Sequence, residues 1–169
     1  MAGATVYQLS EEPITPENFM TEEDAFETPF YEQIADFMYE LGDRMAAETF
    51  LADSLLMFNK EQELVSIARK PDGHIESITF REGFHTAYFA SSYEKFMRLL
   101  AELSAKSTPA NYVEGKLETR ISVLQSAYEN IYGDYVYTDG CEFVTFDNFI
   151  RYAATGTPYY LGEILGYHW

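Results

Sequence analysis

Two spacings of hydrophobic residues alternate along the chain, and together they predict a fold of the α+β class. Apolar residues recur at helical spacing at Phe30, Ile34, Phe37, Met38, Leu41 and Met45. Residues 53–80 carry short apolar or alternating runs instead, which favour strands at Ser54–Phe58, Leu64–Ala68 and His74–Phe80. The sequence Lys70-Pro71-Asp72-Gly73 is a strong turn signal between the last two runs. We therefore expect a helix followed by an antiparallel β-meander.

The same mixture continues after the meander. A strand is expected at His85–Ala90, because its apolar and polar residues alternate. Ser91 has Glu94 three residues further on, which is the capping box of a helix N-terminus. The apolar stripe of Phe96–Leu103 follows directly. This segment is predicted to be a strand and then an amphipathic helix.

The last third of the chain predicts a second set of elements that complete the core. A helix is expected from Leu117 to Ile131, and a hairpin with a tight turn is expected over Tyr135–Phe146. Asp147 is a candidate cap for a short helix. The tail Pro158–Trp169 is dense in aromatic residues, so we expect it to dock on the core.

Length and composition indicate one domain with an acidic N-terminal arm. The chain has 169 residues, enough for a single domain, and its 14 Tyr and 13 Phe supply a sizeable core. Residues 1–28 combine two prolines with scattered acids, which predicts an arm that is only partly ordered. We expect residues 29–169 to form the single α+β domain, an antiparallel sheet packed with several amphipathic helices.

Charge excludes several classes of partner. The formal net charge is −17, from 28 acids and 11 bases, so binding to nucleic acid through phosphates is not expected. Docking on an anionic membrane is disfavoured for the same reason, and no apolar run is long enough to span a bilayer. A basic protein partner is compatible with this charge.

The acids concentrate in the first 50 residues, which hold 12 of them and a single base, Arg44. We predict a partner-binding acidic face made of Glu22, Glu23, Asp24, Glu27, Glu32, Asp36 and Glu40. On the expected helix, Glu32, Asp36 and Glu40 share one ridge at intervals of four residues, where like charges repel. An ordinary solvated surface explains the same acids equally simply.

No motif for catalysis, nucleotide binding or metal binding is present. The sequence has no GxGxxG, Walker A, GxSxG, HExxH, CxxC or EF-hand pattern. Its histidines, His74, His85 and His168, are not paired at metal-ligand spacing. Cys141 is the only cysteine and the first residues do not resemble a signal peptide, so we expect a cytoplasmic protein without cofactor or metal.

One stretch carries a family resemblance. His85–Leu100 (HTAYFASSYEKFMRLL), with the meander before it, resembles the ending of SUKH-superfamily domains over roughly residues 54–103. Those domains finish with a strand, a Ser-Ser or Asn-Ser cap and an amphipathic helix. The resemblance implies a binding module without catalytic residues. Many members are immunity proteins that neutralise toxins, often nucleases or deaminases, and such toxins are commonly basic.

The sequence therefore favours a non-enzymatic binding protein of the inhibitor type that occludes a basic partner. One alternative is a DNA mimic from a phage or mobile element that blocks a restriction or CRISPR nuclease, which requires carboxylates spaced like phosphates. Another alternative is a small enzyme whose cleft is lined by His85 or His168 and an acid.

Overall fold

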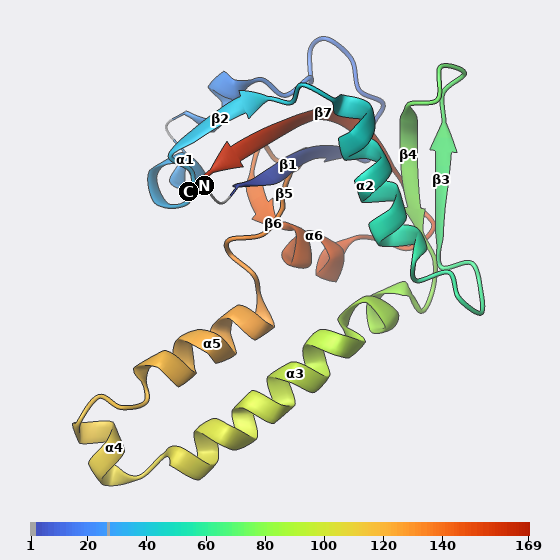
Figure 1. Cartoon of the computed structure of the whole chain (residues 1–169). Coiled ribbons are helices and arrows are strands. Elements are labelled where there is room, and N and C mark those ends of the chain that lie inside the picture. The colour runs from blue at the N-terminus through green and yellow to red at the C-terminus, as the bar shows by residue number, and fades with distance from the viewer. Residues whose placement is uncertain (1–2, 27) are drawn as a thin grey trace.

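The computed structural model describes residues 3–26 and 28–169, and its centre is a mixed, mostly antiparallel sheet (Figure 1). Within these residues the sheet has seven strands in the order β3-β4-β7-β1-β5-β6, and β2 also pairs with β7. The strands are β1 (Gly3–Ser10), β2 (Phe37–Glu40), β3 (Val65–Arg69), β4 (Ile75–Phe80), β5 (Tyr135–Tyr137), β6 (Phe143–Thr145) and β7 (Pro158–His168).

The two central strands, β1 and β7, are far apart in the sequence. They are antiparallel, with Val6 opposite Leu165, while β5 runs parallel to β1 with Tyr135 opposite Val6. The 11-residue β7 is long enough to pair with β4 along its first part and with β2 along its last part. This strand therefore joins most of the sheet.

Alternate residues of the central strands belong to two separate hydrophobic clusters, because successive side chains of a strand point to opposite faces of the sheet. Tyr7 and Ile164 belong to the larger cluster, which α2 (Arg44–Leu56), α6 (Phe146–Tyr152) and the start of α3 cover. Val6 and Leu165 belong to the smaller cluster, which the segment carrying η1 (Glu22–Ala25) and α1 (Pro29–Gln33) covers.

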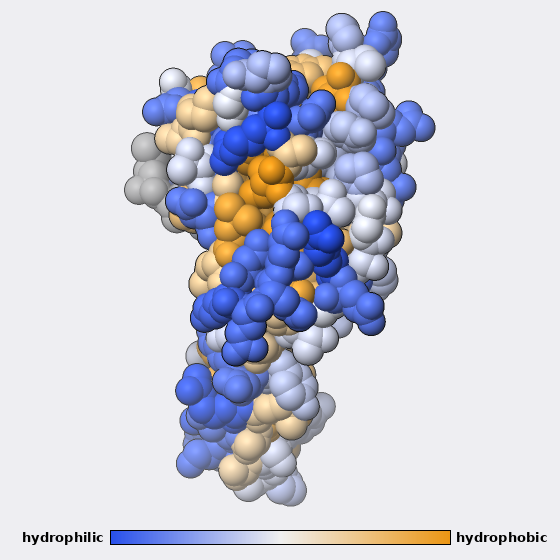
Figure 2. Space-filling model, turned by 90° about the vertical axis from the view of Figure 1, so that its right-hand side faces the viewer, coloured by the Kyte–Doolittle hydropathy of each residue, from blue (hydrophilic) through white to orange (hydrophobic). Residues whose placement is uncertain are grey.

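A helical hairpin projects from this body (Figure 1). It consists of α3 (Phe84–Lys106), α4 (Pro109–Val113) and α5 (Glu118–Tyr128), and α3 packs along α5. We call these residues, Phe84–Tyr128, the arm and the rest of the chain the body. Seen from the side of β3 and β4, the body has a hydrophobic area bounded by hydrophilic residues above and below, and the arm extends beneath it (Figure 2). Among the described residues, no helix combines the length and the apolar character needed to cross a bilayer.

Several predictions are confirmed. The fold is α+β, with strands at Val65–Arg69 and Ile75–Phe80 on either side of the predicted turn. The hairpin of β5 and β6 is present, and the aromatic tail forms the buried strand β7. The short helix α6 is also present, although Thr145 caps it rather than Asp147.

The expected structure of the first 45 residues is wrong in two places. Gly3–Ser10 was expected to belong to a loose N-terminal segment (residues 1–28), but it forms a central strand, because its apolar residues Val6, Tyr7 and Leu9 each belong to one of the two hydrophobic clusters. The helix expected from Phe30 to Met45 ends at Gln33, and Phe37–Glu40 forms β2. A partner strand, β7, more than a hundred residues away outweighs the local helical pattern.

Two expected strands are helical. Ser54–Phe58 is not a strand, because α2 runs on to Leu56. His85–Ala90 lies inside α3, so Ser91 is an interior residue and not a cap. Phe84 and Tyr88, one helical turn apart, both pack on Phe58, so a helix lets this segment bury both rings. Within the region of SUKH resemblance, His85–Leu100 thus lies in one continuous helix and not in a strand, a cap and a helix.

Candidate partner-binding site

The formal charge is divided unevenly between arm and body. The arm carries +1, from four acids and five bases: Glu94, Glu102, Glu114 and Glu118 against Lys95, Arg98, Lys106, Lys116 and Arg120. The remaining 24 acids and 6 bases give the body −18. The acidity of the chain therefore belongs to the body alone.

Within the body, two stretches contain acids and no Lys or Arg. Residues 1–43 hold 11 acids and residues 133–150 hold 4. The sheet brings these stretches together, because β1 pairs with β5 and β5 pairs with β6. The described acids of both stretches therefore lie on neighbouring parts of the body, and neither stretch contributes a Lys or Arg.

A cavity of about 500 Å³ opens where these stretches meet. Five carboxylates line it, from Glu11, Glu12, Glu17, Asp24 and Asp139. All five residues are solvent-exposed. The aromatic rings of Phe19 and Tyr137 and the side chain of Cys141 also line it. We call this feature the acidic cavity.

Buried polar contacts fix the segment that forms one wall of the acidic cavity. Gln8 is 4% exposed, and its Oε1 accepts hydrogen bonds from the backbone N–H of Met20 at 2.9 Å and of Glu163 at 3.1 Å. A Cβ on Gly162 would lie 2.1 Å from that Oε1, so glycine is required there for the side chain of Gln8 to fit. The path of residues 11–20 is therefore set by a buried amide and a glycine on β7.

The turn between β5 and β6 forms the opposite wall of the acidic cavity, and one hydrogen bond joins it to the segment of residues 11–20. Asp139, in the turn between β5 and β6, accepts the backbone N–H of Glu11 at 2.8 Å. Asp24 is held by the capping box of η1, where its carboxylate accepts the backbone N–H and the hydroxyl of Thr21. Two carboxylates of the acidic cavity, those of Asp139 and Asp24, are thus held in place by hydrogen bonds.

The carboxylates of the acidic cavity are not neutralised from within the chain. Among the described residues, ion pairs join Arg44, His74, Arg81, Lys116 and His168 to other acids, and none involves these five. A hydrogen bond from the Thr15 side chain lowers the pKa of Glu17. Burial raises the pKa of the Tyr137 phenol, which keeps this ring neutral beside the carboxylates. The arrangement suits a cationic group, which would gain several carboxylate acceptors and contact with the exposed ring of Phe19.

The predicted acidic residues are spread over three elements. Glu22, Glu23 and Asp24 belong to η1, and Asp24 alone lines the acidic cavity. Glu32 is on α1, whereas Asp36 and Glu40 are on or beside β2, so these three do not form the expected helical ridge. All six lie on the body, and Glu27 lies outside the described residues.

Sequence reasoning missed Glu11, Glu12, Glu17 and Asp139. The first three are in the segment that was expected to be loose, where their high density was the available signal. Asp139 had no local signal at all, because only the sheet brings it to Glu11.

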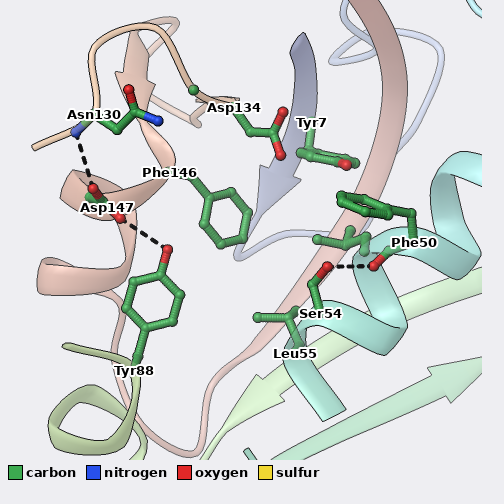
Figure 3. Close-up of a pocket in the computed structure, with 11 residues that line it drawn as sticks. Tyr7, Phe50, Ser54, Leu55, Tyr88, Asn130, Asp134, Phe146 and Asp147 are labelled. Carbon is green, nitrogen blue, oxygen red and sulfur yellow. Dashed lines mark hydrogen bonds between the residues drawn. The ribbon is translucent and has the colours of Figure 1, made fainter. Parts of the chain in front are cut away.

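A second cavity, of about 260 Å³, lies between the body and the base of the arm (Figure 3). Asp147 accepts the Tyr88 hydroxyl at 3.0 Å and the Asn130 backbone N–H at 3.2 Å. Burial raises the pKa of Asp134, although this carboxylate accepts the Thr5 N–H at 2.9 Å. Both acids point toward the cavity, yet each is tied to a neighbouring element, which indicates a role in joining arm and body.

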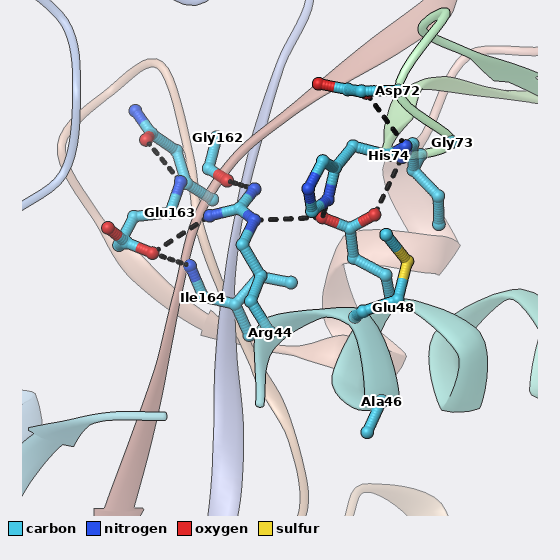
Figure 4. A network of polar contacts seen from close by, with 12 residues as sticks. Arg44, Ala46, Glu48, Asp72, Gly73, His74, Gly162, Glu163 and Ile164 are labelled. Atoms are coloured by element: carbon cyan, nitrogen blue, oxygen red, sulfur yellow. Dashed lines mark hydrogen bonds and ion pairs between the residues drawn. The ribbon is translucent and has the colours of Figure 1, made fainter. Parts of the chain in front are cut away.

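A buried polar network fastens α2 to the sheet (Figure 4). The Glu48 side chain is 0% exposed and accepts hydrogen bonds from Arg44 Nε at 2.9 Å, His74 Nδ1 at 3.0 Å and the Ile75 N–H at 2.7 Å. Arg44 also contacts Glu163 at 3.0 Å. Burial acts to raise the pKa of Glu48, but these hydrogen bonds outweigh it and lower the pKa. The guanidinium of Arg44 is thus engaged by two carboxylates inside the body.

The histidines have structural surroundings. His85 Nε2 donates to the Ala153 carbonyl at 2.9 Å, and His168 stacks on Phe37 with Asp36 3.6 Å from its Nδ1. Across the part of the chain that the structure describes, no group of three or more His, Cys, Asp or Glu side chains is placed to hold a metal ion.

Comparison with known proteins adds no relative to this picture. No family model matches the chain, and neither a curated protein nor a solved structure matches it.

Proposed function

We propose that this chain is a non-enzymatic binding protein that uses the acidic side of its body to occlude a basic surface of another protein. The observation that carries the proposal is the acidic cavity: five carboxylates without an internal counter-ion, beside two aromatic rings, on a surface with no Lys or Arg from its own segments. Such a surface attracts a basic protein over a distance and rejects acidic ones.

The cavity suggests how the partner is held after the encounter. An Arg or Lys side chain inserted among Glu11, Glu17 and Asp139 would find carboxylate acceptors, and Arg pairs with carboxylates in a bidentate fashion. Phe19 is 40% exposed at the same place and offers an apolar anchor. Aromatic anchors and buried Arg residues are the commonest hot spots of protein interfaces.

Proteins that act on nucleic acids are a class of partner with the required basic surface. Such a partner would normally bind phosphates with the residues that the acidic cavity engages. Binding would therefore block its access to nucleic acid, which is an inhibitor's action. The DNA-mimic hypothesis is a special case in which the carboxylates follow the spacing of phosphates.

The test compares two charge-matched variants in affinity capture from extracts of the source cells. The cavity variant carries four substitutions, Glu11→Gln, Glu12→Gln, Glu17→Gln and Asp139→Asn. The control variant carries four on the arm, Glu94→Gln, Glu102→Gln, Glu114→Gln and Glu118→Gln. Each changes the formal charge from −17 to −13. Rim charge pairs contribute about 0.2–1 kcal/mol each, so the four substitutions of the cavity variant should weaken binding of the captured protein by at least ~4-fold.

The wild type and the control should retain the same basic protein at low salt and release it at high salt, and duplex DNA should compete for it. Equal retention by both variants, or an affinity that does not change with salt, would contradict the proposed role of the acidic cavity.

A further inference from the structure

The arm has few buried residues. Phe84 is the only buried residue of α3 and Ala127 the only one of α5, and Leu117 is buried just before α5. The half-buried residues Phe96, Leu99 and Leu103 recur at helical spacing on α3, and Phe96 contacts Tyr128 of α5 with ring centroids 6.0 Å apart. This seam joins the two helices.

A second apolar stripe on α3 is largely exposed to solvent. Tyr93, Met97 and Leu100 follow the same helical spacing one position later and are 62%, 43% and 38% exposed. Tyr93 and Tyr128 flank an apolar cleft of about 300 Å³ between α3 and α5. One side of the arm thus presents an exposed apolar stripe beside an apolar cleft, which a monomer gains nothing by exposing.

The most exposed apolar residues of the arm region lie at its two ends. Tyr112 and Val113 on α4, at the tip, are 78% and 83% exposed. Tyr152 on α6 is 82% exposed, next to Arg151, which lines the cleft at the base of the arm. Tip and base would meet if two arms lay side by side in opposite directions.

Charge indicates which protein covers this face. The arm carries +1 while the body carries −18, so the arm is the one large surface through which two copies can approach without strong repulsion. The 23 residues of α3 span ~34 Å, several times the Debye length of ~8 Å at physiological salt. In an antiparallel pair the acidic bodies therefore lie at opposite ends, beyond most of their mutual repulsion.

We propose that two copies of this chain associate through their arms, antiparallel and related by a two-fold axis, to form a four-helix bundle. Tyr93, Met97 and Leu100 lie in its centre, and the tip of each arm packs near Tyr152 of the other copy. With a diameter of ~10 Å, α3 (~34 Å long) and the 11-residue α5 (~16 Å long) present a face of roughly 500 Å² per copy. Two copies would bury about 1,000 Å² in all, the area that a specific interface must reach.

The test is the molar mass of the full chain in solution, measured by light scattering or sedimentation equilibrium across a concentration series at low and high salt. The wild type should reach twice the monomer mass, and higher salt should strengthen the dimer because it screens the repulsion between bodies. Binding of a basic partner should weaken with salt, so failure of this inference and failure of the proposed function are distinguishable.

Two substitutions locate the interface. Met97→Glu places a charge in the middle of the apolar stripe and should raise the dimer Kd by ~30-fold or more. Ser91→Glu adds the same charge to an exposed position on the other side of α3 and should leave the Kd unchanged. Circular dichroism of both variants checks that the arm is still helical.

A monomer at every concentration would overturn the proposal. A dimer that Met97→Glu and Ser91→Glu weaken equally, or not at all, would overturn it too, since the contact would then lie elsewhere.

Discussion

Replacing Glu48 by Gln tests whether the buried network in Figure 4 stabilises the fold. The carboxylate serves two sides: Oε1 accepts from Arg44 and His74, and Oε2 accepts from the Ile75 N–H. Glutamine has one carbonyl oxygen, so its NH₂ group must face a donor on one of these sides. The substitution keeps the size of the side chain and therefore leaves no cavity.

The expected loss of stability follows from these contacts. An unsatisfied buried donor costs about 1–3 kcal/mol, and hydrogen bonds to a charged group are worth about 1.5–3 kcal/mol each against about 1 kcal/mol for neutral ones. Because Arg44 keeps its contact with Glu163, we expect a total loss of about 3 kcal/mol. With an m-value of ~2 kcal/mol/M, the urea midpoint should fall by ~1.5 M.

Urea unfolding followed by circular dichroism measures this loss, and Asp53→Asn is the matched control. Asp53 is exposed on the same helix, so its substitution removes the same charge and should change stability by less than ~0.5 kcal/mol. A Glu48→Gln variant as stable as this control would refute the reasoning.

The pH dependence of stability gives a second test of the role of Glu48. The folded-state pKa of Glu48 is lowered, so its contribution is present above the pKa of the unfolded chain and is lost as pH falls through the folded-state value. The difference between wild type and variant should therefore shrink in acid.

Two further substitutions follow from the structure. Gly162→Ala should displace the side chain of Gln8, because the new Cβ would lie 2.1 Å from its Oε1; hydrogen exchange at the Met20 amide should then speed up, and unchanged exchange would contradict this. Asp134→Asn should raise stability at neutral pH. Burial raises the pKa of Asp134 in the folded chain, so stability is lost as the pH rises from the pKa of this group in the unfolded chain to its pKa in the folded chain. Asparagine removes this loss, because it carries no charge, and it can still accept the Thr5 N–H. Thermal unfolding at neutral and acid pH checks the second substitution, and a less stable variant at neutral pH would show that ionised Asp134 is favourable.

The elements that sequence predicted well have local causes. The turn at Lys70–Gly73 joins β3 and β4, and the hairpin of β5 and β6 closes around Asp139. In both cases the turn residues and the strands they connect are neighbours in the sequence. Hydrophobic spacing and turn chemistry are then sufficient.

The elements that sequence missed depend on distant partners. Phe37–Glu40 has helical spacing but becomes a strand because β7 offers an edge, with Met38 opposite Tyr167. Alternation at His85–Ala90 suggested a strand, although Phe84 and Tyr88 are equally one helical turn apart. The acidic cavity could be predicted only as an excess of acids, since Asp139 meets Glu11 across 128 positions.

The position of β7 in the sheet has a consequence for the order of folding. β7 is the last strand in the sequence, yet β1, β2 and β4 all bond to it. On the ribosome, β1 is made first but its antiparallel neighbour emerges only after residue 158. The arm, whose contacts are local, can become helical long before the sheet can close. Until then the N-terminal segment carries an excess of acids, and repulsion between these charges opposes aggregation of unfinished chains whose hydrophobic strands still lack their central partner.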